Sequence, residues 1–147
     1  MRSFPFLFLG ALAACGGGGN SSASTPNPDP GLTAIGELQG SGEASPVAGQ
    51  PISLEAVVTG DFQDNDTDTS RNLGGFYVQG AADGNPATSD GIFVYDGASP
   101  STDVQTGDIV RVDGTIKEFF GETQVDAESV TVIGSGSIQP ATVTLPA

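Results

Sequence analysis

Three aspartates stand at alternate positions in the polar stretch GDFQDNDTDTSRN. Asp64, Asp66 and Asp68 have the spacing at which an EF-hand loop presents its first three side-chain ligands, and carboxylates are ligands that calcium prefers. The rest of the stretch departs from that motif, because Thr69 stands where a glycine is expected and Gly75 where a bidentate glutamate is expected. Two interpretations follow: a calcium site made by the three carboxylates, or a solvated and mobile connection between strands.

Three aromatic residues in two short apolar segments form a second candidate site. Tyr77 lies in GFYVQ, and Phe93 and Tyr95 lie in GIFVYDG. Exposed aromatic rings on paired strands can stack nucleic-acid bases, at ~1–3 kcal/mol per base. Alternation puts Phe93 and Tyr95 on one face, whereas the strand register decides the face of Tyr77, so at least one ring is expected in the core. Core packing and interface packing are the alternatives to a stacking platform.

The charge balance limits what such a platform can bind. The 147 residues carry 18 acidic and 4 basic side chains, for a formal net charge of −14. This surface repels phosphate backbones and anionic headgroups, so nucleic acid would have to bind at a local site. Apart from the amino-terminal Arg2, the basic residues available to build that site are Arg71, Arg111 and Lys117.

The composition argues against a catalytic centre in this chain. It contains no histidine and one cysteine, so a nucleophile has no evident base partner. Glu118 and Glu122 in EFFGET are an acid pair that could exchange protons, although the segment is typical of a solvated hairpin turn. We therefore expect no enzymatic activity and no required cofactor, with calcium as the one metal that the pattern allows.

Short strands are the elements that must position these residues. Alternating apolar residues predict strands at 51–59, 76–79, 92–95, 108–120 and 123–132, the last broken by polar residues 126–129. Gly114 lies inside the fourth strand, where a bulge or kink would let the strand turn a barrel corner. The segment ASPSTDVQTG before it is too polar for a helix, and no amphipathic helix is visible elsewhere. We predict an all-β fold, a five-stranded Greek-key barrel.

Three stretches resemble one protein family in their residues and in their order. They are IGELQGSGEASPVAGQPISLEAVVTGDF, the hairpin segments GFYVQ and DGIFVYDG, and GDIVRVDGTIKEFFGETQ. Over roughly residues 35–133 the chain is similar to the OB-fold domain that precedes the catalytic domain in secreted bacterial nucleases of the ExeM/NucH type. The catalytic part of those proteins belongs to the endonuclease/exonuclease/phosphatase superfamily, which uses histidine and metal-binding carboxylates. The resemblance implies an OB-like barrel in a nucleic-acid context, without that catalytic domain in these 147 residues.

The amino terminus predicts export and a lipid anchor. MRSFPFLFLGALAAC has a basic residue, an apolar core and small residues before Cys15, as in a bacterial lipoprotein signal peptide over 1–14. Cys15 would carry the lipid, and an ordinary secretory signal cleaved elsewhere is the alternative. A flexible Gly/Ser/Pro tether over 15–31 leads to an OB-fold domain at 32–134 and a linker at 135–147. Gly16, directly after the cysteine, favours the outer membrane or cell surface.

Together these features predict a non-catalytic OB-fold accessory module of a surface-anchored extracellular nuclease, assisting nucleic-acid binding or positioning. The expected partners are single-stranded nucleic acid or a nuclease catalytic domain, with the membrane contacted through the lipid anchor only. The alternative is a lipid-anchored structural or calcium-dependent interaction module of the cell envelope, with no nucleic-acid role. A third interpretation is that the chain is a fragment of a longer nuclease.

Overall fold

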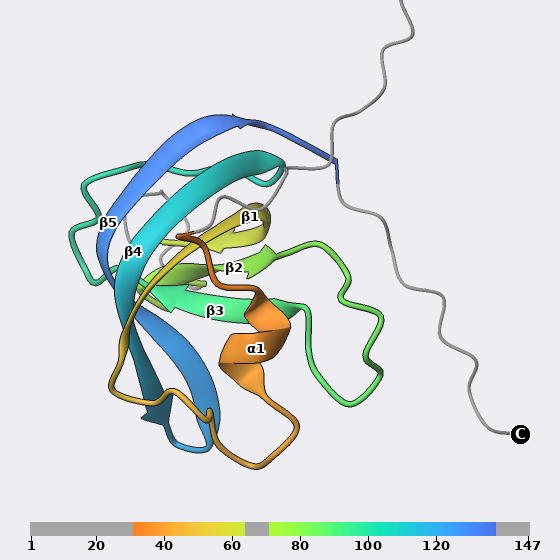
Figure 1. The fold of residues 1–147 in the computed structure, drawn as a ribbon. Coiled ribbons are helices and arrows are strands. Elements are labelled where there is room, and N and C mark those ends of the chain that lie inside the picture. Colours follow the sequence, from red (N-terminus) through yellow and green to blue (C-terminus); the bar gives the residue numbers. More distant parts are fainter. Residues whose placement is uncertain (1–30, 64–70, 138–147) are drawn as a thin grey trace, which may run out of the picture.

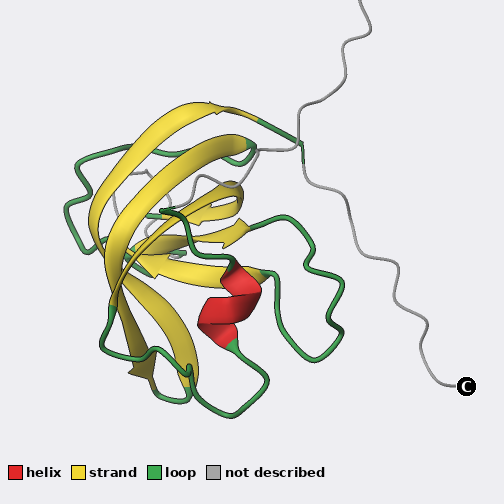
Figure 2. Ribbon diagram, viewed as in Figure 1, coloured by secondary structure: helices red, strands yellow, loops and turns green. Residues whose placement is uncertain are grey.

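The computed structural model describes residues 31–63 and 71–137 (Figure 1). The elements in chain order are α1 (Ile35–Gln39), β1 (Pro51–Phe62), β2 (Gly75–Gln79), β3 (Gly91–Tyr95), β4 (Asp108–Phe119) and β5 (Glu122–Ser135). Figure 2 shows curved strands wrapped around a common interior, with one short helix in the described part of the chain. Within these residues no helix is long and apolar enough to cross a membrane.

The strands close into a barrel in the order β1-β2-β3-β5-β4, and β4 pairs back onto β1. Neighbouring strands are antiparallel except for β3 and β5, which run parallel. β1 serves two neighbours, because its residues 51–57 pair with β4 and its residues 57–62 pair with β2. A closed five-stranded Greek-key barrel with this order is an OB-like fold, so the predicted fold class is confirmed.

The core consists of the apolar residues whose alternation with polar residues predicted the strands. Every strand contributes fully buried side chains, among them Leu54, Phe76, Val94, Val112 and Val125. The residues next to them in sequence point outward, since successive strand residues face opposite sides of a sheet. Ile35 and Leu38 of α1 join the same buried cluster. Each large side chain buried here stabilises the barrel by roughly 1.5–3 kcal/mol. Residues on the outer face do not contribute to this core.

Four strands are longer than the alternation predicted, and β2 and β3 each gain one residue, Gly75 and Gly91. β1 continues to Phe62, because a register shift between Val58 and Gly60 absorbs Thr59 and lets the pairing with β2 resume. β5 runs to Ser135, and the polar residues 126–129 lie inside it rather than breaking it. β4 ends at Phe119 rather than at 120, because Phe120 adopts a positive φ of 50° and begins the turn.

The helix α1 is an element that the sequence did not predict. Its five residues are too few to show a helical period. Tertiary contacts support it instead: Ile35 and Leu38 are buried, and the Gln39 side-chain amide donates a hydrogen bond to the Gly91 carbonyl at 2.7 Å. α1 therefore lies beside β3, as Figure 1 also shows.

Gly114 marks the predicted corner of β4. The pairing of β4 with β5 shifts register between Asp113 and Gly114, where β5 carries one extra residue, Glu128. A Cβ atom on Gly114 would collide with the Asp126 carbonyl oxygen and lie 3.0 Å from Ala127 Cα. The two strands can approach this closely only because residue 114 is glycine. A bulge therefore lies at the predicted corner, but its extra residue belongs to β5 and not to β4.

The connection between β3 and β4, residues 96–107, contains bends and turns and no helix, as predicted. Val104 projects from it into the core and is fully buried. Gln63, also 0% exposed, holds the connection in place from the end of β1. Its amide nitrogen donates to Asp96 Oδ2 at 2.5 Å and to the Thr102 carbonyl at 2.9 Å, and its Oε1 accepts from the Val104 N–H at 3.0 Å. One buried side chain thus ties two loops together.

Candidate binding face

The three predicted aromatic residues share the outer face of the barrel. Tyr77 of β2 lies directly opposite Phe93 of β3 in the strand pairing, and Tyr95 lies two residues further along β3. Their neighbours Phe76, Val78 and Val94 fill the core. The side chains of Tyr77, Phe93 and Tyr95 therefore point away from the core, and we call this surface the aromatic face.

The rings of the aromatic face differ in how much surface they expose. Tyr77 is 36% exposed and Tyr95 40%, whereas Phe93 is 7% exposed. The Tyr77 and Phe93 ring centroids are 4.9 Å apart with the planes tilted by 55°, and the Phe62 and Tyr77 rings are perpendicular with their centroids 6.0 Å apart. Phe93 and Phe62 support the Tyr77 ring from two sides. Two tyrosine rings remain available for a ligand.

A glycine beneath the aromatic face makes room for Phe93. Gly75 pairs with Tyr95 and lies on the same side of β2 as Tyr77. A Cβ atom on Gly75 would lie 2.8 Å from Phe93 Cζ and would collide with the Val94 carbonyl oxygen. The Phe93 ring thus rests on the backbone of β2, which explains why GGF precedes the exposed tyrosine.

A groove of about 590 Å³ runs beside Tyr77 and Phe93. Its lining residues on the strands are Tyr77, Ile92 and Phe93, and we call this side the floor. The other lining residues, which we call the walls, come mainly from the end of α1 with the following turn, from the β2–β3 loop and from the β4–β5 hairpin. The wall residues with polar side chains are Gln39, Glu43, Ser89, Glu122 and Thr123. This lining contains two carboxylates and no lysine or arginine.

Glu122 fixes the outer end of the Tyr77 ring. The Tyr77 hydroxyl donates a hydrogen bond to Glu122 Oε1 at 3.3 Å. Partial burial raises the pKa of the Tyr77 hydroxyl above its ordinary value, and the negative charge of Glu122 together with this hydrogen bond raises it further. The groove therefore presents an aromatic floor with a hydrogen-bond acceptor at its edge, in a negative potential.

The predicted basic residues do not gather around this groove. Lys117 of β4 lies on the outer face next to Gln124, which pairs with Phe93, but its ammonium group forms an ion pair with Asp126. Arg111 lies six residues earlier on β4, roughly 20 Å away along the strand, and faces Glu55 at 3.8 Å. Arg71 is exposed in the connection between β1 and β2. Of the three, the strand pairing brings Lys117 alone close to the aromatic face.

The β4–β5 hairpin exposes two aromatic residues in the segment EFFGET, which the sequence predicts to be a solvated turn. Phe119 is 57% exposed and Phe120 is 96% exposed, with their rings 4.7 Å apart in an edge-on arrangement. Two bulky aromatic residues at a turn, where small or polar residues are usual, are the pattern that could have identified them. Glu118 is also less free than predicted, because its Oε1 accepts hydrogen bonds from the Ser45 N–H and the Thr123 hydroxyl, both at 2.8 Å.

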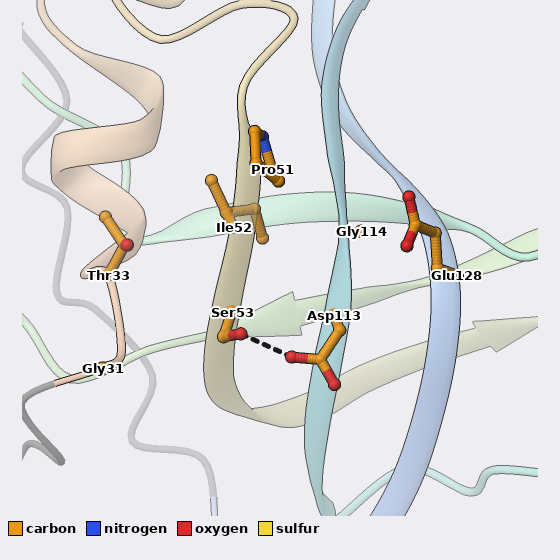
Figure 3. A pocket seen from close by; sticks show the side chains of 8 residues that line it. All are labelled: Gly31, Thr33, Pro51, Ile52, Ser53, Asp113, Gly114 and Glu128. Atoms are coloured by element: carbon orange, nitrogen blue, oxygen red, sulfur yellow. Dashed lines mark hydrogen bonds between the residues drawn. The ribbon is translucent and has the colours of Figure 1, made fainter.

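A second hollow lies near the bulge at Gly114 and has a volume of about 330 Å³ (Figure 3). The Ser53 hydroxyl donates to Asp113 Oδ1 across β1 and β4, and the Ser129 hydroxyl donates to Asp113 Oδ2 at 3.0 Å. The hydrogen bonds from Ser53 and Ser129 hold the pKa of the Asp113 carboxyl below its usual range. The Asp113 carboxylate thereby links β4 to both β1 and β5.

Several predicted site residues lie outside the described residues. These are Cys15, with the signal peptide and tether before the barrel, and the calcium candidates Asp64, Asp66 and Asp68. Within 31–63 and 71–137, no group of three or more acidic, histidine or cysteine side chains is arranged to hold a metal ion. The calcium site remains a prediction.

No protein-family model matches this chain, and no curated protein matches it significantly. Among solved structures, an OBody named AM1L10 bound to hen egg-white lysozyme is similar to it, with a TM-score of 0.48 and 10% sequence identity. That similarity covers 78% of this chain and 100% of the OBody chain. The fold of this chain is established by its own strand order and pairing.

The chemistry that this face offers is stacking and hydrogen bonding. Two exposed tyrosine rings, one diagonal step apart on paired strands, can each contact a flat ligand. The groove walls supply carboxylate, amide and hydroxyl groups, while Lys117, which the strand pairing places beside this face, is already paired with Asp126. A ligand of this face gains little from neutralisation of phosphate charge.

Proposed function

We propose that this chain is a non-catalytic OB-fold module of a surface-anchored extracellular nuclease, and that its aromatic face helps to bind or position single-stranded nucleic acid. The observation that carries the proposal is the pair of exposed rings, Tyr77 and Tyr95, on β2 and β3. OB-folds bind oligonucleotides on this face of the barrel. The resemblance of residues 35–133 to the domain that precedes the catalytic domain in ExeM/NucH-type nucleases supports the same context.

Stacking has to supply most of the affinity in this proposal. The formal net charge of −14 opposes the approach of a phosphate backbone, and the described ion pairs of Lys117 and Arg111 reduce what these residues offer a phosphate. Binding is therefore expected to be weak. Its salt dependence is expected to be flat, because screening of like-charge repulsion offsets the usual loss from counterion release.

Titration of the whole chain with a labelled single-stranded DNA, followed by anisotropy, tests this function. Each of Tyr77→Ala and Tyr95→Ala is expected to weaken binding about tenfold, the loss of roughly one stacked base. Ile133→Ala, at an exposed position near the end of β5, is the control and should bind as wild type does. No binding by the wild-type chain at concentrations approaching millimolar, with or without calcium, would contradict the proposal.

The partner of such a module is a nuclease catalytic domain, and the module itself carries no catalytic role. A second candidate function is a structural or calcium-dependent interaction module of the cell envelope. The observation that favours it is the acidic groove lining, which contains Glu43 and Glu122 and no basic residue. Absence of DNA binding together with a calcium-dependent rise in melting temperature would favour this second function.

We also propose that Cys15 is lipidated and that residues 15–31 tether the barrel to the outer membrane or cell surface. The support is the LAAC sequence and the single cysteine of the chain. Cys15→Ser is expected to move the protein from the membrane fraction to the soluble exported fraction while its circular dichroism spectrum stays unchanged. Retention of the variant in the membrane fraction would rule out the lipid anchor.

A further inference from the structure

The Glu122 carboxylate lies at the edge of the exposed Tyr77 ring, where it can contact a ligand that stacks on the ring. Tyr77 forms part of the groove floor, and its hydroxyl end is held by Glu122 at 3.3 Å. A base stacked on the Tyr77 ring lies parallel to it, so that the edge of the base projects past the perimeter of the ring. On the side of the hydroxyl, that edge meets the Glu122 carboxylate.

The groove walls around this point mainly offer acceptors to a base. An ionised carboxylate accepts hydrogen bonds and donates none, and Glu43 adds a second carboxylate to the lining. The Gln39 amide donates one hydrogen bond to the Gly91 carbonyl at 2.7 Å, which leaves its carbonyl oxygen as an acceptor and one N–H as a donor at the wall. The absence of lysine and arginine from this lining keeps phosphate groups outside, so a base rather than the backbone enters.

The bases differ in how many donors they present to a carboxylate. Guanine carries the N1–H and the N2 amino group side by side on its pairing edge, and these match the two oxygens of a carboxylate. Cytosine and adenine present one amino group each, and thymine presents one N–H. An acceptor-lined groove with a stacking floor therefore favours guanine.

We propose that the groove beside Tyr77 binds unpaired guanine, stacked on Tyr77 and paired through its N1–H and N2 amino group with the Glu122 carboxylate. This inference rests on the proposed function and adds base selectivity to it. Tyr77 supplies the stacking surface, and its hydroxyl orients the carboxylate. Selectivity then arises from base contacts, while the acidic surface keeps the affinity for the backbone low.

The test compares short thymidine strands with otherwise identical strands that carry isolated guanines or isolated inosines. Inosine keeps the N1–H and lacks the N2 amino group. The whole chain has two tyrosines and no tryptophan, so quenching of tyrosine emission in the Tyr95→Phe variant reports on Tyr77 alone. We expect the guanine strand to bind about tenfold more tightly than the thymidine strand, the value of one good bidentate contact, with the inosine strand in between.

Two variants separate the carboxylate from the ring. Glu122→Gln is expected to remove the preference for guanine and to leave binding of the thymidine strand unchanged or slightly stronger. Tyr77→Phe keeps the ring and loses the hydroxyl, so it should reduce the preference less severely. Because this variant lacks the reporting tyrosine, its binding is followed by anisotropy of labelled strands. Glu128→Gln is the control, because it makes the same change of charge on β5 outside this groove and should keep the full preference.

The outcomes distinguish this inference from the function on which it rests. Equal binding of the guanine and thymidine strands by the wild-type chain would overturn the guanine site and leave the nucleic-acid function standing. Loss of all binding in Glu122→Gln would also overturn it, since Glu122 would then only support the ring. Failure of every strand to bind the wild-type chain would overturn both.

Discussion

Replacement of Gly75 by alanine is expected to destabilise the barrel by about 3 kcal/mol, as overpacking at a site that cannot relax. The added Cβ would lie 2.8 Å from Phe93 Cζ and would collide with the Val94 carbonyl oxygen. A side chain can change rotamer, but the Val94 carbonyl belongs to the backbone of β3, so the β2–β3 pairing itself has to move. The expected fall in melting temperature is roughly 10 to 20 °C for a domain of this size.

Gly91→Ala is the matched control for this experiment. Gly91 lies in the same hairpin and pairs with Gln79, and the nearest atom to its added Cβ is the Val78 carbonyl oxygen at an ordinary contact distance of 3.6 Å. Alanine there should leave the melting temperature within a few degrees of wild type. Thermal unfolding followed by circular dichroism compares the two variants. Equal stability of both would mean that Gly75 does not hold Phe93 against the strand.

Gly75→Ala also couples the fold to the proposed function. Displacement of Phe93 removes the support of the Tyr77 ring, whose centroid lies 4.9 Å away. Binding of single-stranded DNA should therefore weaken in Gly75→Ala even at temperatures where the variant is folded. Gly91→Ala is the variant that should retain wild-type stability. The position of the Tyr77 ring therefore depends on the β2 backbone at Gly75, through Phe93, as well as on the aromatic side chains themselves.

The barrel could be predicted because its strands carry their own pattern. Val110, Val112 and Ile116 alternate with polar residues along β4, and a glycine inside that strand indicated the corner where it bends. Such local patterns survive in the sequence because each strand buries one face. The helix α1 left no comparable pattern, since its support comes from Gly91 and the core rather than from its own five residues.

The binding face could be predicted only in part, because it depends on pairing between distant residues. The side on which Tyr77 lies follows from its register with Phe93, and the sequence does not contain that register. The ion pairs Lys117–Asp126 and Arg111–Glu55 also join different strands, so they too depend on a strand register that the sequence does not contain. The exposure of Phe120 does not follow from the sequence pattern either, because the polar residues of EFFGET indicate a solvated turn and do not show where its aromatic side chains lie.

Gln63→Leu is expected to lower the free energy of unfolding more than the other substitutions proposed for this protein. The role of Gln63 cannot be read from the sequence, because its hydrogen-bond partners come together only in the folded chain. Leucine has a similar size but offers no hydrogen bond. The buried Val104 N–H loses its acceptor at 3.0 Å, and the Thr102 carbonyl and the Asp96 carboxylate lose the amide donor. Each buried group that loses a partner costs about 1–3 kcal/mol, so the free energy of unfolding should fall by about 4 kcal/mol.

The reason for so large an effect is the place of this side chain in the barrel. The connection at 96–107 contains no helix, and Val104 in the core together with the hydrogen bonds of Gln63 holds it against the end of β1. Urea unfolding of Gln63→Leu measures the loss, with Gln105→Leu as the control, since Gln105 is exposed in the same connection and should change stability by less than about 0.5 kcal/mol. If both variants unfold at the same urea concentration as wild type, the connection is held by Val104 alone. If only Gln63→Leu is destabilised, the hydrogen bonds of the buried amide hold the connection against the end of β1 in addition to the packing of Val104.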